Sequence, residues 1–280
     1  MEFTTAAELF SRITLPVLGY IQTVILLLFL LPGAAILGYY SGRGRTKAGP
    51  GGEPAGALVG EATLGAIMSL LGLLLAFTFA NAVVVSQQRT QTINDEAAAI
   101  GTAFLRADYL PDPGRSELQQ AILDYAETRV TTGGDPIRSI GQAQAFIETS
   151  LIAQGELWPQ TLEATSDPVP AATKSFVASA VNEVLDSHLD RIQSLSSPIS
   201  TLAQGMLLSI ALVALFLLGN RSGVAGRPLT WRTFLFAYSL FAIMVTITDI
   251  QRATEGFVTV NDTTLKATIF EMTQSMSERS

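Results

Sequence analysis

Four long apolar stretches constrain this chain more than any other feature of its sequence. A helix needs roughly 17 to 25 mostly apolar residues to cross the hydrocarbon core of a bilayer. The stretches of about that length are Ile13–Tyr40, Ala62–Val85, Leu202–Leu218 and Thr233–Ile250. Because lipid offers no hydrogen-bond partner to a bare backbone, each should be a helix. The sequence therefore predicts an all-α fold: a four-span helical membrane protein with a helical extramembrane insert between spans 2 and 3.

The first apolar stretch differs from a secretory signal peptide. Its leader, residues 1–12, carries Glu2 and Glu8 beside Arg12, so no basic region precedes the apolar run. The run is also longer than the apolar part of a signal peptide, and no small-residue cleavage site follows it cleanly. We therefore expect a retained span, with a kink near Pro32–Gly33 because proline removes one helical hydrogen bond.

Composition excludes several classes of protein. Apolar residues make up 48% of the chain and charged residues 15%, against about 25% charged in soluble domains. The net charge of −7 leaves no basic stripe, so we expect no nucleic-acid partner. With no cysteine and one histidine, His188, we expect no metal and no cofactor. The sequence also lacks a nucleophile–base set, so we do not expect an enzyme.

The expected organisation follows the apolar stretches. A leader (1–12) precedes spans 1 and 2 (13–85), which are joined by a basic loop rich in glycine and proline (41–61). The insert (86–200) holds 7 basic and 15 acidic residues. Spans 3 and 4 (201–250) and a C-terminal segment with a short helix (251–280) complete the chain.

Within the insert, breaking residues and apolar periodicity predict helix boundaries. Span 2 should continue unbroken as one helix over 62–109, since no glycine or proline interrupts 81–100. The next helix should begin with Asp112 as its N-cap and Pro113 at its first position. A third should end at Pro159, and a fourth should cover about 171–195. After span 4, Asn261 and Asp262 should cap a short amphipathic helix that ends near Met276, and Arg106 and Asp108 should attach the end of the long helix to its neighbours.

Loop charges mildly favour one orientation. The two short loops carry Arg43, Arg45, Lys47, Arg221, Arg227 and Arg232. The opposite flanks carry Arg12, Arg89, Arg191, Arg252 and Lys266, spread more thinly. Since basic loops tend to stay in the cytoplasm, we expect an external insert on a multi-pass membrane protein.

Span 2 carries two overlapping patterns. Its small residues Gly65, Ser69, Gly72, Ala76 and Ala80 form a stripe typical of a close helix contact. The alternative interpretation is a pore-lining face, because Ser69, Leu73, Phe77 and Asn81 recur once per helical turn. Apolar side chains around an axis can gate ion flow by excluding water, which makes these four residues candidates for a pore neck.

The charged candidates lie near the membrane boundary. Asp95 and Glu96 are adjacent, so they do not face each other on a helix and should make separate ion pairs. In a ring of subunits they are also candidates for a charge ring. Asp249 and Arg252 have the spacing of a structural ion pair at the end of span 4. His188 is expected at a packing boundary, with pH sensing as the alternative.

The segments Leu70–Pro111 and Asp249–Val260 resemble the bestrophin-like family of bacterial membrane proteins. The residues that carry the resemblance are Leu71, Gly72, Leu73, Ala76, Phe77, Glu96, Ala97, Ala99, Ile100, Gly101, Thr102, Asp249, Arg252 and Gly256. The chain departs from the family pattern at Ala253, where the family usually has proline, and it keeps only Arg89 of a basic cluster after span 2.

The resemblance implies a relation to bestrophins, which are pentameric anion channels whose second spans line a hydrophobic neck. It also implies a place in the bacterial inner membrane, with the insert and both termini in the cytoplasm, opposite to the orientation that the loop charges favour. An acidic insert repels anions, so cation or weakly selective conduction is equally open.

Two functional hypotheses remain open. The first is a homo-oligomeric ion channel, pentameric if it follows bestrophins, whose partners are further copies of the chain, the lipid bilayer and inorganic ions. The second is a membrane sensor or partner-binding protein, in which the insert receives a signal and the long helix transmits it. The number of subunits distinguishes the two.

Overall fold

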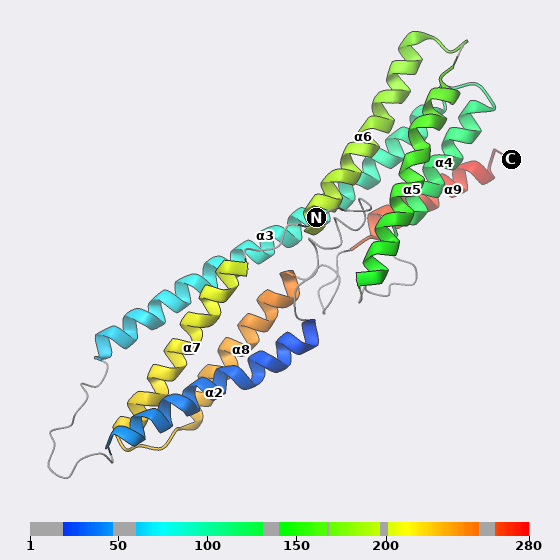
Figure 1. Ribbon diagram of the computed structural model, residues 1–280. Helices are drawn as coiled ribbons and strands as arrows, with labels where there is room; N and C mark the ends of the chain where they lie inside the picture. Colours follow the sequence, from blue (N-terminus) through cyan, green and yellow to red (C-terminus); the bar gives the residue numbers. More distant parts are fainter. Residues whose placement is uncertain are drawn as a thin grey trace, which may run out of the picture. The chain divides into compact units, whose positions relative to one another are not determined.

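The computed structural model describes residues 19–46, 60–130, 140–166, 168–196, 201–251 and 261–279, and all regular structure in them is helical (Figure 1). The leader, part of the first loop and Arg252 lie outside these residues. The helices are α2 (Tyr20–Thr46), α3 (Glu61–Ala107), α4 (Gly114–Thr128), α5 (Ile140–Ala164), α6 (Ala171–Ser196), α7 (Thr201–Val224), α8 (Trp231–Gln251) and α9 (Thr263–Ser277). The all-α prediction is therefore confirmed.

The helices divide between two compact units. The membrane unit contains α2, the first part of α3, α7 and α8. The insert unit contains the rest of α3 with α4, α5, α6 and α9. Helix α3 therefore contributes residues to both units.

In the described part of the chain four helices are long and apolar enough to cross a membrane, as predicted: α2, α3, α7 and α8. The first of them runs unbroken through Pro32 and continues to Thr46, beyond the expected end of span 1 at Tyr40. Its last turns carry Gly38 and Gly42, which lie against the backbone of α7. This contact explains why α2 stays helical past its most apolar part.

Glycines bring α2 and α7 unusually close. A Cβ atom added at Gly38 would overlap the carbonyl oxygen of Phe216, and one added at Gly219 would overlap that of Ala35. Gly42 and Gly223 make equivalent backbone contacts. Each helix thus presents a G-x-x-x-G motif, the spacing that lets backbones approach within a membrane.

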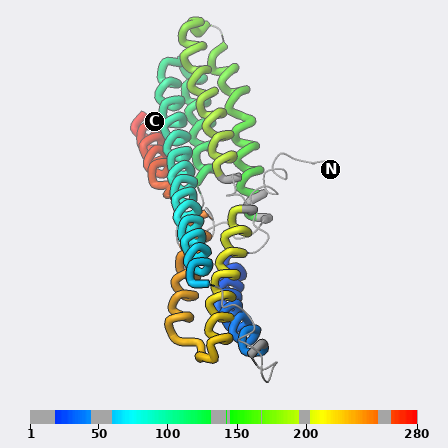
Figure 2. The backbone as a smooth tube through the Cα atoms, turned by 90° about the vertical axis from the view of Figure 1, so that its left-hand side faces the viewer, coloured from blue at the N-terminus to red at the C-terminus, as the bar shows by residue number. Residues whose placement is uncertain are grey.

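The long helix α3 is continuous over 47 residues, as the sequence predicted (Figure 2). At 1.5 Å per residue its length is about 70 Å, more than twice the thickness of a hydrocarbon core. One half carries the apolar sequence of span 2, and the other half packs in the insert unit.

Apolar side chains from five helices form the core of the insert unit. Its fully buried members include Ile100, Phe104, Leu118, Ile122, Leu157, Val177, Val181 and Leu265. The last of these belongs to α9, which begins after Asn261 and Asp262 as expected, and the Asn261 side chain accepts a hydrogen bond from the Thr263 amide at 2.9 Å.

Two boundaries in the insert differ from the prediction. The N-cap of α4 is Pro113 and not Asp112, whose carboxylate pairs instead with Arg115. In addition, α5 continues through Pro159 to Ala164. Leu157 and Ala164, on either side of the proline, are buried in the core, so packing holds the helix together past the missing hydrogen bond.

Ion pairs and hydrogen bonds attach the end of α3 to its neighbours, as predicted. Arg106 donates from Nη1 to the Phe176 carbonyl at 3.0 Å and to Ser179 Oγ at 2.9 Å, both on α6. Asp108 pairs with Arg279, just after α9, and accepts a hydrogen bond from Gln119 on α4 at 2.9 Å.

Candidate functional site: an exposed face of α3 and a buried charge cluster

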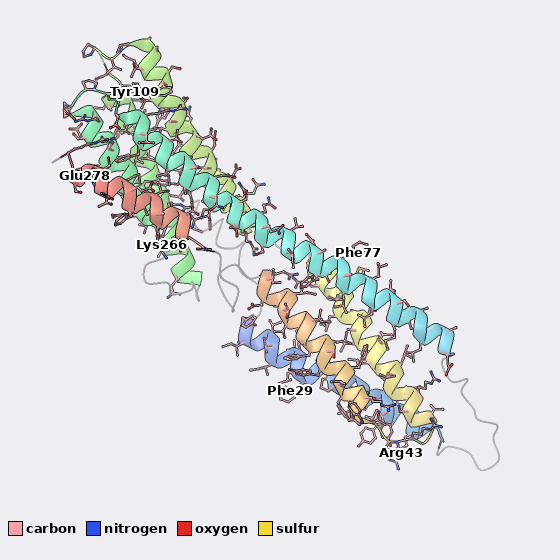
Figure 3. All side chains as sticks on the ribbon, turned by 180° about the vertical axis from the view of Figure 1, so that it is seen from behind. Phe29, Arg43, Phe77, Tyr109, Lys266 and Glu278 are labelled. Carbon is pink, nitrogen blue, oxygen red and sulfur yellow. The ribbon has the colours of Figure 1, made fainter. Side chains whose placement is uncertain are left out.

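The four neck candidates share one face of α3. Leu73 and Phe77 are 53% and 63% exposed, and Ser69 and Asn81 are exposed as well. In Figure 3 the Phe77 side chain points away from its helix into open space. We call this surface, Ser69–Leu73–Phe77–Asn81, the neck face.

The small residues lie on and beside the same surface. Added Cβ atoms at Gly65 and Gly72 would meet no atom within 4 Å, so neither glycine makes a close contact inside the chain. By contrast, Leu71 and Ala82 on α3 are 2% and 0% exposed. The span therefore has one face packed within the chain. Its other face is exposed and carries small residues, polar residues and the large apolar side chains of Leu73 and Phe77.

Asp95 and Glu96 point in different directions, as adjacent helical residues must. Asp95 is exposed and accepts a hydrogen bond from Gln91 Nε2 at 2.8 Å. Glu96 is 0% exposed. Two interpretations were open for these residues, a charge ring and separate ion pairs. Asp95 is exposed, as a residue of a charge ring must be, whereas Glu96 makes buried ion pairs.

The Glu96 carboxylate lies at the centre of a buried cluster. Arg129, at the end of α4, donates from Nε to Oε1 at 2.8 Å, and Arg191 on α6 donates from Nη1 to Oε2 at 2.5 Å. The Tyr125 hydroxyl donates to Oε1 at 2.8 Å and lies 2.9 Å from His188 Nδ1. We refer to Glu96, Tyr125, Arg129, His188 and Arg191 as the Glu96 cluster.

The hydrogen bonds fix the proton positions in this cluster. Because the Tyr125 hydrogen serves the Glu96 carboxylate, the hydroxyl oxygen accepts from His188, whose proton is then on Nδ1. Arg191 also donates from Nη2 to the Arg129 carbonyl at 3.1 Å. The Arg129 guanidinium lies over the Phe146 ring, with Cζ 5.6 Å from the ring centroid. Helices α3, α4 and α6 therefore contribute the cluster residues, and Phe146 of α5 packs against them.

Burial and the two arginines determine the protonation states. Burial tends to raise the pKa of Glu96, but Arg129 and Arg191 outweigh it and hold that pKa below its usual value. Burial, reinforced by the Arg129 charge, lowers the pKa of His188 to about 4. At neutral pH the cluster thus contains one carboxylate, two guanidinium groups and a neutral imidazole.

Comparison with known proteins agrees with this architecture. The sequence profile of the Bestrophin-like domain matches residues 31–265. The chain belongs to the bestrophin-like family. No curated protein matches the sequence.

Two solved structures of a bacterial bestrophin homologue from Klebsiella pneumoniae, each with a single substitution, share the fold. The first is 12% identical, with a TM-score of 0.61 over 90% of this chain and 99% of the homologue. The second is 11% identical, with a TM-score of 0.57 over 91% and 98%. The four-span bestrophin-like fold is thereby confirmed.

The structure shows what part of the bestrophin-like sequence motif does. Glu96 is the centre of the charge cluster, and Ala97, Ala99 and Ile100 belong to the insert core. The next motif residue, Gly101, faces Thr268 on α9, and an added Cβ atom would lie 3.4 Å from that side chain. This part of the motif therefore fixes α3 to its neighbours in the insert.

Several of the charged and titratable candidates are buried. His188 is fully buried and not at a packing boundary. Asp249 is 5% exposed, and its expected partner Arg252 lies outside the described residues. Arg89 and Arg191, counted among the basic residues that flank the membrane, are 5% and 6% exposed and so do not reach lipid headgroups.

Sequence reasoning missed Tyr125, Arg129 and the two glycine motifs. The glycine spacing is a local signal that the apolar runs contain, Gly38 with Gly42 and Gly219 with Gly223. No local pattern marks Tyr125 or Arg129, because their partner Glu96 is 29 and 33 residues away in the sequence.

Proposed function

We propose that several copies of this chain assemble into an ion channel in which α3 surrounds the axis and the neck face lines the pore. The observation that carries the proposal is the uncovered neck face on a membrane-spanning helix. Asn81 and Ser69 are poorly suited to lipid, because polar side chains in a bilayer favour protein or water. A water-filled passage between copies suits them better.

The small-residue stripe supports the same arrangement. Gly65 and Gly72 have open space around them in the single chain, whereas glycines in membrane helices commonly mark close helix contacts. A neighbouring copy of α3 would fill that space. The two interpretations of span 2 are then compatible, since small residues pack between copies while Leu73 and Phe77 face the axis.

Family membership supports the proposed arrangement of α3, because the resemblance to bestrophins implies second spans that line a hydrophobic neck. In the proposed assembly the large apolar side chains of Leu73 and Phe77 exclude water at the narrowest point. Beyond them, Asp95 from each copy forms a ring of negative charge. Such a ring attracts cations and repels anions, so the proposed channel prefers cations.

The proposed orientation places the insert outside the cell. With Arg89 and Arg191 buried, fewer basic residues flank the membrane on the insert side than the six of the two short loops. The chain lacks cysteine, so a single Glu117→Cys substitution on α4 can be labelled in intact cells with a thiol reagent that does not cross membranes. Labelling supports the external insert, and labelling only after cell lysis contradicts it.

Ion flux from purified protein in liposomes tests the neck. Phe77→Ala shortens the side chain proposed to close the pore, so flux should rise, by about tenfold for each 1.4 kcal/mol removed from the barrier. Phe29→Ala is the matched control, because Phe29 on α2 is also exposed, at 71%. It should leave flux unchanged. Equal flux in the wild type and Phe77→Ala would remove the neck assignment.

A further inference from the structure

The Glu96 cluster carries an excess of positive charge in the interior of the insert unit. Arg129 and Arg191 are 1% and 6% exposed, and Glu96 is the carboxylate that pairs with both of them. His188 contributes no negative charge. Among the described residues one guanidinium charge therefore remains uncompensated, and a buried charge without a partner is costly.

The same two arginines have hydrogen-bond donors left over. Nη1 and Nη2 of Arg129 and Nε of Arg191 are fully buried and have no hydrogen-bond partner in the described part of the chain. Nε2 of His188 is also buried without a partner there, but with the proton on Nδ1 it is an acceptor and not a donor. Buried polar groups are nearly always satisfied in folded proteins, so three unpaired donors in one cluster indicate a ligand.

The chemistry of these atoms identifies the class of ligand. A cation would be repelled, and a neutral molecule would satisfy the donors without balancing the charge. An anion does both, and the planar fork of Arg129 is the geometry that binds anions most readily. Phe146 already lies against one face of this guanidinium, so an anion would bind at the free edge, and the full burial of the edge atoms favours a small ion.

We propose that the free guanidinium edge of Arg129, together with Arg191 Nε, binds a small monovalent anion such as chloride inside the insert unit. This site is separate from the neck face, since Glu96 and Arg129 are buried whereas the neck residues are exposed. Because the liganding atoms have no accessible surface, the end of α4 at Arg129 must open for the anion to enter. The proposal does not depend on whether the chain conducts ions.

The single histidine provides a direct test. His188 is the one histidine of the chain, so its imidazole signals in an NMR spectrum of the full-length protein in detergent need no assignment, provided that the purification tag contains no histidine. Replacing gluconate with chloride at constant ionic strength should shift these signals along a saturable curve. The apparent melting temperature should also rise with the logarithm of chloride concentration.

Two variants localise the effect. Arg129→Lys keeps the positive charge but lacks the planar fork, so the chloride response should fall at least tenfold in apparent affinity. Arg106→Gln is the matched control, because Arg106 belongs to the insert unit but donates to α6. It should keep the wild-type response.

Each outcome decides for or against the site. A saturable shift in the wild type that Arg129→Lys weakens supports it. No chloride-specific shift in the wild type overturns it, even if the variant does not fold. A shift that Arg129→Lys leaves unchanged also overturns it, because the anion would then bind elsewhere.

Discussion

Arg191 forms a buried ion pair with Glu96 across 95 residues of chain, joining α6 to α3 inside the insert unit. Glu96 is on the same continuous helix as Phe77, and its side chain leaves α3 on a buried side, away from Asp95. The ion pair therefore fixes which side of α3 faces α6 within the insert unit. In the proposed channel the rotation of α3 about its own axis decides which side chains face the pore.

Removal of the Glu96 charge should destabilise the insert strongly. Glu96→Gln leaves two buried guanidinium groups without a carboxylate, and breaking a buried ion pair costs about 3–5 kcal/mol. Thermal unfolding followed by circular dichroism measures the loss. Asp95→Asn is the control from the adjacent, exposed position and should change stability by less than about 0.5 kcal/mol. Equal effects of the two substitutions would show that the cluster is not a stabilising centre.

Stability should fall as the pH drops from 6.5 toward 4. His188 has its pKa lowered to about 4 in the fold, so the unfolded chain binds a proton more readily across this range. Protonation also brings a third positive charge beside Arg129 and Arg191. The loss should approach about 3 kcal/mol in chloride-free buffer. Melting curves at several pH values test this, and His188→Gln should flatten the dependence above pH 5.

The backbone contact between α2 and α7 should tolerate no side chain. Gly219→Ala places a methyl group against the Ala35 carbonyl, and overpacking of this kind costs about 1–3 kcal/mol. The control is Gly33→Ala on α2, where an added Cβ atom meets nothing within 4 Å. The apparent melting temperature in detergent should fall for the first variant alone. Similar melting temperatures for both would mean that the two helices separate easily.

Ion preference should depend on Asp95. Asp95→Asn removes the charge but keeps a side chain that can bond Gln91, so folding should be unaffected. The ratio of cation to anion permeability, taken from reversal potentials in planar bilayers, should decrease. Glu127→Gln, which removes one insert charge from α4, serves as the control for a general charge effect. An unchanged ratio in Asp95→Asn would exclude Asp95 from the ion path.

The sequence predicted those parts of the fold that depend on local signals. Hydropathy located the four candidate spans, and the absence of glycine and proline over 81–100 predicted the long helix α3. The error at Pro159 arose because packing of Leu157 and Ala164 outweighs a local breaking signal. The Glu96 cluster could not be predicted, because its arginines are 33 and 95 residues from the carboxylate.

The neck candidates also show the difference between what local sequence signals predict and what they do not. Periodicity placed Ser69, Leu73, Phe77 and Asn81 on one face of α3, and the structure shows that face to be exposed. Periodicity does not say what covers an exposed face in the membrane, since lipid and a second copy of the chain both suit an apolar helix. That question concerns the assembly and not the single chain.

A subunit-resolved image of the purified protein in a lipid environment tests the central claim most directly. The account predicts a closed ring of copies with α3 innermost and Phe77 of every copy directed at the axis. A single chain, or an assembly in which Phe77 faces the surrounding lipid, would contradict it.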